Sequence, residues 1–402
     1  MNVYDEALKL HKALEGKIET QNKLDVTTRE QLSLVYSPGV AQPCIEIHKD
    51  PSKVYDYTIK ANTVAVVSDG SAVLGLGNIG ALASIPVMEG KAMLFKKFAN
   101  LNAFPICLDT QDTEEIIETV RRIAPVFGGI NLEDISAPRC FEIEDRLQDL
   151  GIPVFHDDQH GTAIVVLAGL INAAKVVKKN IFDLKVVING AGAAGGSITR
   201  LLKCIDTADN DHCVSVRDII VCDSKGIISS SRPDLTSDKV GLLKYTNVND
   251  KSGSLKDALI NADVFIGVSK ANLLNADDIR TMAKDSIIFA LANPTPEIMQ
   301  DEAYKGGAMV FGTGRSDMPN QVNNVLGFPG IFRGALDAKA KRITTGMKLA
   351  AAYAIADSIE NPTPEYIIPS ALDMEVPRRV AAAVKAVAIA TFGEVNPELN
   401  KA

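Results

Sequence analysis

The sequence predicts an α/β fold of two units, the second of which is a doubly wound parallel sheet. Three observations predict it. Between residues 184 and 314, short apolar runs typical of strands covered on both faces alternate with segments of helical spacing. One of these runs leads directly into a glycine-rich turn and a helix-compatible segment. A second alternation occupies residues 1–160, and repeated alternation of this kind gives parallel sheets with right-handed crossovers.

The later unit should contain five strands, each a continuous apolar run. They are Lys185–Asn189, Asp218–Cys222, Val264–Val268, Ser286–Leu291 and Met309–Gly312. Helical spacing lies between them at Leu255–Ala262 and Ala276–Lys284. Because ligands of doubly wound sheets bind beyond the carboxyl ends of the strands, the residues that end these strands should line one crevice. The polar or glycine residues at these ends are Asp223, Ser269, Asn293 and Gly314.

A glycine motif follows the first of these strands and reads Gly190-Ala191-Gly192-Ala193-Ala194-Gly195. In a Gly-x-Gly-x-x-Gly pattern the first glycine permits a tight turn, the second lets the backbone approach a pyrophosphate, and the third lets helix and strand pack closely. The helix N-terminus then faces the negative charge. The motif predicts a Rossmann-like domain that binds NAD or NADP, the alternative being an ordinary glycine turn. The expected contacts are Gly190, Gly192, Ala193, Ala194 and Gly195.

Asp223 ends the second strand of this unit, where an acidic residue typically hydrogen-bonds the adenosine ribose. A carboxylate there favours NAD, because it repels the 2′-phosphate of NADP. Ser224, Lys225 and Arg232 follow and could receive that phosphate, so NADP stays the alternative cofactor.

A second Gly-x-Gly-x-x-Gly pattern, Gly75 to Gly80, competes with the first, and Asp109 follows it at a similar remove. The strand before it is interrupted by the turn-like segment Ser68 to Ser71, which favours the later motif as the dinucleotide site. The earlier glycines should either bring backbone close to a small ligand or form a packed turn.

Residues 1–160 should form a separate domain that binds substrate and metal, and residues 161–324 the dinucleotide domain. A buried helix over Gly161–Lys179 should join them, and alanine-rich helices in residues 325–402 should complete the first domain or form an oligomer surface. The helices expected in the first domain are Val3–Leu14, Thr113–Ile123 and Arg139–Leu150, and its strands are Thr63–Val67, Ala103–Leu108, Gly129–Leu132 and Pro153–His156. The late helical stretches are Ala335–Ile359 and Arg378–Ala390.

The composition indicates a soluble, cytoplasmic protein. The chain has 402 residues, of which 46% are hydrophobic and 23% charged. A net charge of −8 argues against nucleic acid as a partner, since such binding needs a basic surface. No apolar run reaches membrane-spanning length, and the first twenty residues hold no apolar signal core. The six cysteines form no Cys-x-x-Cys pair and are expected to be reduced, buried thiols.

Two carboxylate pairs follow strands of the first domain. Glu133-Asp134 comes after Gly129–Leu132, and Asp157-Asp158 comes after Pro153–His156. If these strands are neighbours, the acids meet, and like charges so close are costly unless a proton or a cation neutralises them. Oxygen-rich clusters of this kind suit Mg²⁺ or Mn²⁺, the alternative being solvated loop acids.

Four other polar residues could carry chemistry. Tyr36 lies on the restricted turn Tyr-Ser-Pro-Gly and could donate a proton, although a core or interface tyrosine is the commoner case. Lys91 is flanked by apolar residues, and partial burial would lower its pKa and make it a usable base. Asn293 and Asn324 could orient a carboxylate or a carboxamide without adding charge, and a turn-forming role is the alternative for Asn293.

Taken together, these segments resemble the malic enzyme family. They occur in the family's order over nearly the whole chain, and the His-Asp-Asp-Gln-His-Gly-Thr segment is similar to the compact, bacterial-type branch. The matching segments are Tyr36–Ala41, Ser68–Gly70, Gly75–Gly80, Gly90-Lys91, Glu133-Asp134, Phe155–Ala163, Gly190–Gly195, Phe289–Thr295 and Asn323-Asn324.

The resemblance implies oxidative decarboxylation of L-malate to pyruvate and CO₂ with reduction of NAD(P), by a homodimer or larger homo-oligomer. Lys91 would be the general base for the malate hydroxyl, and Tyr36 would protonate the enol carbon. The implied metal ligands for Mg²⁺ or Mn²⁺ are Glu133, Asp134 and Asp158, with Asp157 in support. The implied substrate-carboxylate ligands are Asn293 and Asn324. Gly75–Gly80 would belong to the substrate domain.

One position departs from the pattern of larger family members. They carry an arginine just after the Asp-Gly turn, where this chain has Ser71-Ala72, so no cation is expected there. Three alternative functions stay open. They are a malolactic-type conversion of malate to lactate, a dehydrogenase that does not decarboxylate, and a non-catalytic nucleotide sensor.

Overall fold

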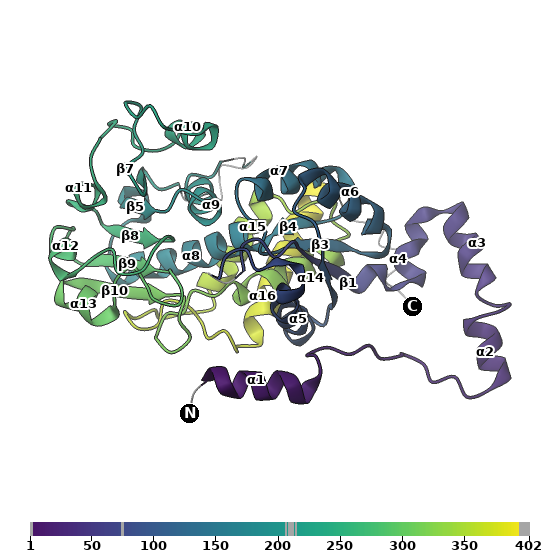
Figure 1. The fold of residues 1–402 in the computed structure, drawn as a ribbon. Helices are drawn as coiled ribbons and strands as arrows, with labels where there is room; N and C mark the ends of the chain where they lie inside the picture. Colours follow the sequence, from purple (N-terminus) through teal and green to yellow (C-terminus); the bar gives the residue numbers. More distant parts are fainter. Residues whose placement is uncertain (1–2, 74–75, 206, 208–212, 214, 394–402) are drawn as a thin grey trace.

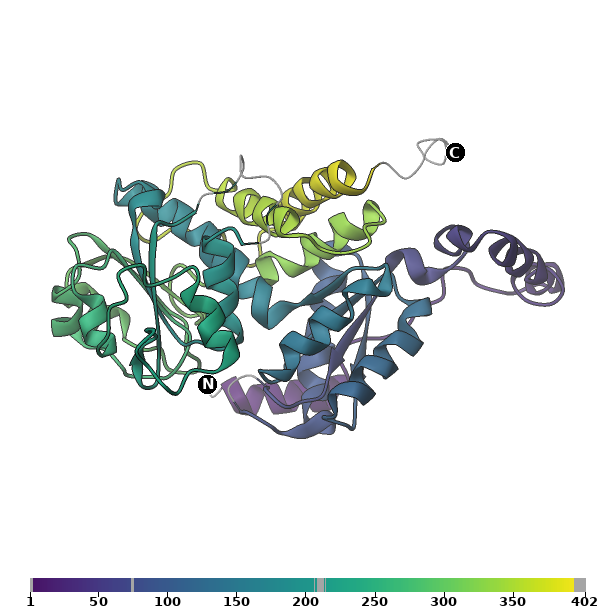
Figure 2. The same cartoon turned by 90° about the horizontal axis from the view of Figure 1, so that it is seen from above.

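The structure, a computed structural model, describes residues 3–73, 76–205, 207, 213 and 215–393. Two sheets with helices against them form its centre and lie side by side (Figures 1 and 2). The strands of the first sheet are all parallel and have the order β2-β1-β3-β4. They are β1 (Thr63–Ser68), β2 (Asn102–Cys107), β3 (Gly129–Leu132) and β4 (Val154–His156).

The second sheet has the order β10-β9-β8-β5-β6-β7 and is parallel except for the short β7, which pairs antiparallel with β6 and was not predicted. Its strands are β5 (Lys185–Asn189), β6 (Asp218–Asp223), β7 (Gly226–Ile227), β8 (Val264–Gly267), β9 (Ser286–Ala290) and β10 (Ala308–Thr313). The predicted α/β fold with a doubly wound sheet is confirmed. The chain leaves β5 for β6 on one side and later returns to β8 on the other, so the carboxyl end of β5 is a topological switch point.

Helices connect the strands and cover the sheets. Those up to the second sheet are α1 (Val3–Leu14), α2 (Arg29–Val35), α3 (Ala41–Lys49), α4 (Val54–Tyr57), α5 (Gly80–Ala99), α6 (Thr113–Ile123), α7 (Arg139–Arg146) and α8 (Asp157–Val176). The helices that follow β5 in the chain are α9 (Ala193–Leu202), α10 (Ser237–Leu243), α11 (Leu255–Leu259), α12 (Ala276–Arg280), α13 (Gln300–Lys305), α14 (Phe328–Asp337), α15 (Thr345–Ala356) and α16 (Glu375–Phe392). Helix α8 begins at Asp157 rather than at the predicted Gly161, because carboxylates suit the first turn of a helix.

The C-terminal helices pack against the first sheet's helices. Phe328 and Phe332 of α14 lie edge-on to Phe95 of α5, with ring centroids 4.7 and 5.3 Å apart. Phe332 also contacts Phe155 of β4 at 5.9 Å. These rings belong to an apolar core that extends into the second sheet, so burial of apolar surface holds the two sheets together.

Helices α2 and α3 with the turn between them, residues 29–49, form an arm that projects from the body of the protein (Figures 1 and 2). No residue of either helix is buried. The arm exposes large apolar side chains, namely Leu32, Leu34, Val35, Val40 and Ile45. Apolar surface gathered on a projecting segment typically marks a protein–protein contact.

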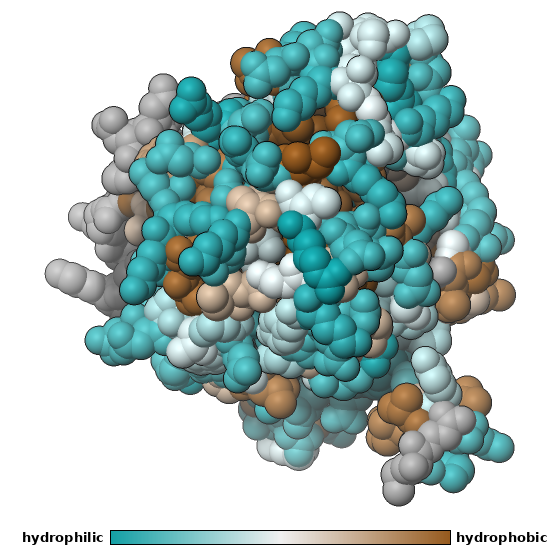
Figure 3. Space-filling view, turned by 90° about the vertical axis from the view of Figure 1, so that its left-hand side faces the viewer, coloured by the Kyte–Doolittle hydropathy of each residue, from teal (hydrophilic) through white to brown (hydrophobic). Residues whose placement is uncertain are grey.

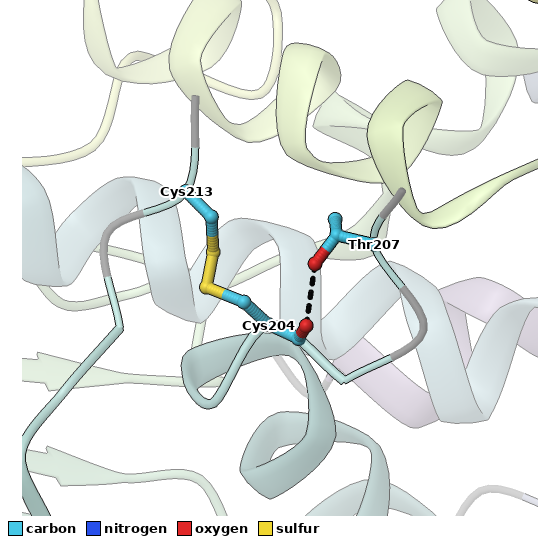
Figure 4. Close-up of a disulfide and its surroundings, with 3 residues drawn as sticks. All are labelled: Cys204, Thr207 and Cys213. Carbon is cyan, nitrogen blue, oxygen red and sulfur yellow. Dashed lines mark hydrogen bonds between the residues drawn. A yellow bond between two sulfur atoms is a disulfide. The ribbon is translucent and has the colours of Figure 1, made fainter. Parts of the chain in front are cut away.

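Cys204 and Cys213 form a disulfide just after the end of α9 (Figure 4). The expectation that all cysteines are reduced is therefore wrong for this pair. Their Cα atoms lie 6.1 Å apart, a proximity that the spacing of the cysteines did not reveal. The free cysteines are Cys44, Cys107, Cys140 and Cys222, of which the last two are buried.

Within the described part of the chain, no helix is both long and apolar enough to cross a membrane. Figure 3 shows the outer side of the second sheet's unit, where most of the surface is hydrophilic and hydrophobic residues occur in small separate groups.

Candidate active site

Two neighbouring strands place four acids at one edge of the first sheet. β3 and β4 are neighbours and pair in register, with Leu132 opposite His156, which meets the condition under which the acids that follow both strands come together. One carboxylate oxygen each from Glu133, Asp134 and Asp158 lies within 4.8 Å of the others. The backbone N–H of Asp134 also donates to Oδ2 of Asp158 at 2.7 Å, which fixes the segment after β3 to the first turn of α8.

Lys91 reaches this edge from the middle of α5 and is buried. Its ammonium group lies 2.8 Å from Oε1 of Glu133, forms an ion pair with Asp157, and stands 4.1 Å from the ring centre of Phe328. The side-chain amide of Asn324 donates to the same Asp157 oxygen. The structure thus joins Lys91, Glu133, Asp157 and Asn324, which are far apart in the sequence, into one buried cluster.

Gly161 makes this cluster possible. A Cβ atom at this position would lie 2.0 Å from Oδ1 of Asp157 and 2.9 Å from Cβ of Asn324. Only glycine leaves room for both side chains against the helix.

Burial and mutual repulsion shift the pKa values of the acids. Burial raises the pKa of Glu133 to about 7, although Lys91 opposes the shift. Burial likewise raises the pKa of Asp157 to about 7 and that of Asp158 to about 6. Nearby carboxylates add to each shift, because gathered negative charges favour the neutral form.

The expected low pKa of Lys91 is wrong for this arrangement. Burial does lower the pKa, but the charges of Asp157 and Glu133 raise it by more, so the pKa of Lys91 lies above its ordinary value. The sequence could not reveal this, because both partners are distant along the chain.

Tyr36 does not join the cluster. It is the C-terminal cap of α2 on the arm, and 68% of the residue's surface is exposed. Both ribbon views place α2 well away from α5, which carries Lys91 (Figures 1 and 2).

The glycine motif forms a close turn at the switch point of the second sheet. Gly190 has φ +125°, and its N–H donates to the carbonyl of Cys222 at 2.9 Å. A Cβ atom on Gly195 would lie 1.7 Å from the carbonyl oxygen of Gly190. α9 begins at Ala193, so its N-terminus opens beside this turn. These are the features that the backbone cradle of a pyrophosphate needs.

The strand ends around this turn carry the predicted polar residues. Ser269 follows β8 and accepts from Asn189 at 2.7 Å. Asn293 follows β9, and a Cβ atom on Gly314 would lie 2.7 Å from its Nδ2 atom. Because β8, β9 and β10 are parallel neighbours, these residues lie along one edge, as expected.

The rival glycine motif lies in the first sheet's unit, between β1 and α5. Gly75 is outside the described residues. Gly70 approaches Gly80 so closely that a Cβ on Gly70 would lie 2.3 Å from the carbonyl oxygen of Gly80. A packed turn therefore explains Gly70, whereas Gly77 and Gly80 have positive φ angles and a Cβ atom on either would meet nothing within 4 Å.

An arginine lies at the Asp-Gly turn although the local sequence has none. Arg139, at the start of α7, pairs with Asp69 at 2.9 Å and donates to the hydroxyl of Ser71 at 3.0 Å. The expectation that no cation is present at this turn is wrong, because Arg139 is brought there from a distant part of the chain.

A second buried network connects the two units, and the sequence did not point to it. His160 of α8 bonds through Nε2 to Glu144 of α7 at 2.9 Å, and through Nδ1 to Ser197 of α9 at 3.0 Å and Lys348 of α15 at 3.1 Å. Glu144 also accepts the backbone N–H of His156 at 3.1 Å. The network thus links His156, which precedes the acids at the start of α8, with Ser197 near the start of α9, the helix that follows the glycine motif.

Comparison with known proteins agrees with this geometry. The family model described as the malic enzyme N-terminal domain matches residues 15–148, and the malic enzyme NAD binding domain matches residues 159–389. A bifunctional malic/malolactic enzyme of Bacillus subtilis is 56% identical over 395 residues, which cover 97% of this chain and 94% of the relative.

Two further relatives give the same result. An NAD-dependent malic enzyme of Geobacillus stearothermophilus is 55% identical over 96% of this chain and 78% of its own length. The crystal structure of an NAD-dependent malic enzyme from Thermotoga maritima superposes with a TM-score of 0.90 at 50% identity, covering 94% of this chain and 98% of that one. The chain therefore belongs to the malic enzyme family.

Proposed function

We propose that this protein decarboxylates L-malate oxidatively to pyruvate and CO₂ while reducing a nicotinamide dinucleotide. The observation that carries the proposal is the buried cluster in which Lys91 meets Glu133 and Asp157 beside further acids. A dinucleotide cradle at Gly190–Gly195 supplies the second half of such a site.

Glu133, Asp134 and Asp158 would hold a Mg²⁺ or Mn²⁺ ion, with Asp157 in support. The fit rests on the gathering of their oxygens within 4.8 Å and on the chemistry of the donor set, since Mg²⁺ and Mn²⁺ prefer carboxylate oxygens. When bound, such an ion supplies Lewis-acid polarisation of a substrate oxygen.

Lys91 would remove the proton of the malate hydroxyl as hydride leaves the carbon that bears this hydroxyl. In the structure two carboxylates keep Lys91 protonated, so a base role requires that less negative charge faces it. Engagement of Glu133 with a cation would leave burial opposed chiefly by Asp157, and would therefore lower the pKa of Lys91. Asn324, already beside Asp157, and Asn293 would orient substrate carboxylate.

Tyr36 would protonate the enol carbon, but the arm carries it away from Lys91 of the same chain. We therefore propose that the protein is a homodimer or larger homo-oligomer in which the arm of one subunit brings Tyr36 to the site of its partner. The exposed apolar side chains of the arm would be buried in that contact.

The direct test is nicotinamide reduction by the purified protein with L-malate and Mn²⁺, with a chelator control and with pyruvate quantified. We expect metal-dependent reduction with an equal amount of pyruvate. Asp158→Ala should abolish it, and retained turnover in that variant would contradict the metal assignment.

A second candidate function is malolactic conversion of malate to lactate. The name of the Bacillus subtilis relative, a bifunctional malic/malolactic enzyme, supports this second candidate. Lactate formed from malate without net nicotinamide reduction would identify this activity in the same assay.

We further propose a cytoplasmic location and a division into residues 1–160 with 325–402, and residues 161–324. The packing of α14 against α5 supports assigning the late helices to the first domain.

A further inference from the structure

The carboxylate of Asp223 lies where the adenosine ribose of a dinucleotide is expected. Asp223 ends β6, the strand beside β5 at the switch point. Its neighbour Cys222 accepts the N–H of Gly190, the first residue of the glycine motif. Asp223 is therefore next to the pyrophosphate cradle, in the position of the ribose-binding acid of Rossmann-like domains.

This carboxylate is already fully engaged by the protein itself. Oδ1 accepts from Nη1 of Arg232 at 2.8 Å and from the backbone N–H of Lys225 at 2.9 Å. Oδ2 accepts from Nη2 of Arg232 at 3.0 Å and from Nζ of Lys239 at 2.6 Å. A carboxylate offers about four lone-pair sites, so these donors leave none of them free. Only 8% of the Asp223 side chain is exposed.

Two consequences follow for a ribose that arrives at this position. The hydroxyls of an unphosphorylated ribose can donate to Asp223 only by displacing one of its present donors. Asp223 also cannot repel a 2′-phosphate in the usual way, because two side-chain cations face its single negative charge. Burial raises the pKa of Asp223, but hydrogen bonds from Arg232 and Lys239 lower it to about 2, so this charge balance holds at neutral pH.

The surrounding ion pairs keep the cations in place. Arg232 also pairs with Asp234 at 2.8 Å, and Lys225 pairs with the same Asp234 oxygen at 2.8 Å. The cluster carries one excess positive charge, because it contains three cations, Arg232, Lys239 and Lys225, and two carboxylates, Asp223 and Asp234. Arg232 is the member best suited to a phosphate, because its guanidinium donates in a planar fork.

We propose that Arg232 and Lys239 are specificity-determining residues that let this ribose subsite accept both NAD and NADP. A 2′-phosphate would draw the two cations from Asp223, whereas an unphosphorylated ribose would compete with them for the carboxylate. The proposal rests on the proposed use of a nicotinamide dinucleotide and names the residues that set the preference. It predicts that removing the cations and removing the acid shift that preference in opposite directions.

The test measures binding without catalysis. Isothermal titration calorimetry with 2′,5′-ADP and 5′-ADP probes the ribose subsite alone, and fluorescence titration with NADPH and NADH probes the whole site, both without malate or metal. For the unmodified protein we expect dissociation constants for NADH and NADPH within about tenfold of each other, because no side chain here excludes either ligand.

Arg232→Ala should raise the dissociation constants of 2′,5′-ADP and NADPH by about tenfold or more, the loss expected for a charge-assisted contact to phosphate. It should leave the constants of 5′-ADP and NADH unchanged or lower, because it frees acceptor sites on Asp223. Lys239→Ala should shift the four dissociation constants in the same directions as Arg232→Ala, but by smaller factors. Asp223→Asn should do the reverse and favour 2′,5′-ADP.

Arg280→Ala is the matched control, because it removes an arginine from another ion pair of the same domain, with Asp277 on α12. It should leave all four constants unchanged. Thermal unfolding of each variant, and Arg232→Lys as a variant that keeps the charge, separate loss of the subsite from loss of the fold.

Equal changes for phosphorylated and unphosphorylated probes in Arg232→Ala would overturn the proposal, as would an Asp223→Asn variant with an unaltered preference. Failure of the proposed function looks different. A protein that binds both dinucleotides with these shifts but does not oxidise malate retains the inference and loses the reaction. A protein that oxidises malate with NAD alone and whose variants show no shift loses the inference only.

Discussion

The ammonium nitrogen of Lys91 lies 2.8 Å from Oε1 of Glu133, and only 7% and 6% of the two side chains are exposed. An ion pair so deeply buried loses the hydration of both charges, and it is stable only where hydrogen bonds and further charges compensate. Here Asp157 and Asn324 supply that compensation. The pair therefore has two effects, because it holds Lys91 in one position and opposes the rise that burial causes in the pKa of Glu133.

The first prediction concerns the stability of this pair. Lys91→Met should lower the free energy of unfolding by about 3–5 kcal/mol in the presence of a chelator, because it leaves buried carboxylates without their cation. Adding Mn²⁺ should restore part of the loss. Urea unfolding with EDTA and with Mn²⁺ measures both effects. Lys97→Met, an exposed lysine on the same helix, is the control and should show neither.

The second prediction concerns pH. Glu133 and Asp158 must lose their protons to bind a cation, and their pKa values are raised to about 7 and about 6. Affinity for Mn²⁺ should therefore be highest above pH 7 and should fall as the pH decreases through 7 and 6, by up to about tenfold per pH unit for each proton displaced. Calorimetry in two buffers of different ionisation enthalpy counts the protons released. A constant affinity between pH 5.5 and pH 8 would contradict the metal site.

The third prediction compares two adjacent glycines of α9. Gly195→Ala should abolish NADH binding, because its Cβ would lie 1.7 Å from the carbonyl oxygen of Gly190 and would push the helix away from the turn. Gly196→Ala meets no atom within 4 Å and should bind NADH normally. Fluorescence titration of both variants provides the comparison, and equal loss in both would show that close helix–strand approach is not what the motif provides.

The fourth prediction tests whether the site is shared between subunits. Tyr36→Phe and Lys91→Ala should each lose nearly all malate oxidation. If Tyr36 acts on the partner's site, a heterodimer of the two variants contains one intact site, so co-refolding equal amounts should recover about a quarter of the original turnover. Recovery should be absent when either variant is refolded alone. No recovery in heterodimers verified by mass would place both residues in one subunit's site.

The fifth prediction concerns the network around His160. The ammonium of Lys348 can only donate, so Nδ1 of His160 accepts from it and Nε2–H donates to Glu144. His160→Ala should lower the free energy of unfolding by about 1–3 kcal/mol, because buried Glu144 loses its side-chain donor.

The same variant should also weaken binding of NADH, since Ser197 of α9 loses its partner. Ser197→Ala, which removes only that contact, should weaken NADH binding with a smaller loss of stability. A His160→Ala protein that is destabilised but binds NADH and Mn²⁺ as before would show that the network is structural and does not position the two sites.

The sequence by itself determined the two sheets and the local motifs. Strands covered on both faces are continuous apolar runs, so β5, β6 and β8 could be located from the order of apolar residues along the chain. Gly195, where no side chain can be accommodated, can likewise be recognised from its place in the glycine motif after a strand. These features depend on residues close together along the chain, and the same is true of the acids that follow β3 and open α8.

Only the tertiary structure decided how distant charges act on one another. Lys91 was expected to have a low pKa, but the fold places it between Glu133 and Asp157, and their charges outweigh burial. The sequence shows no cation directly after the Asp-Gly turn, but the fold places Arg139 of α7 beside this turn. Asp223 was expected to offer its carboxylate to a ribose, yet the fold surrounds it with donors. Electrostatic energy depends on separation in space and on burial, and neither can be obtained from sequence spacing.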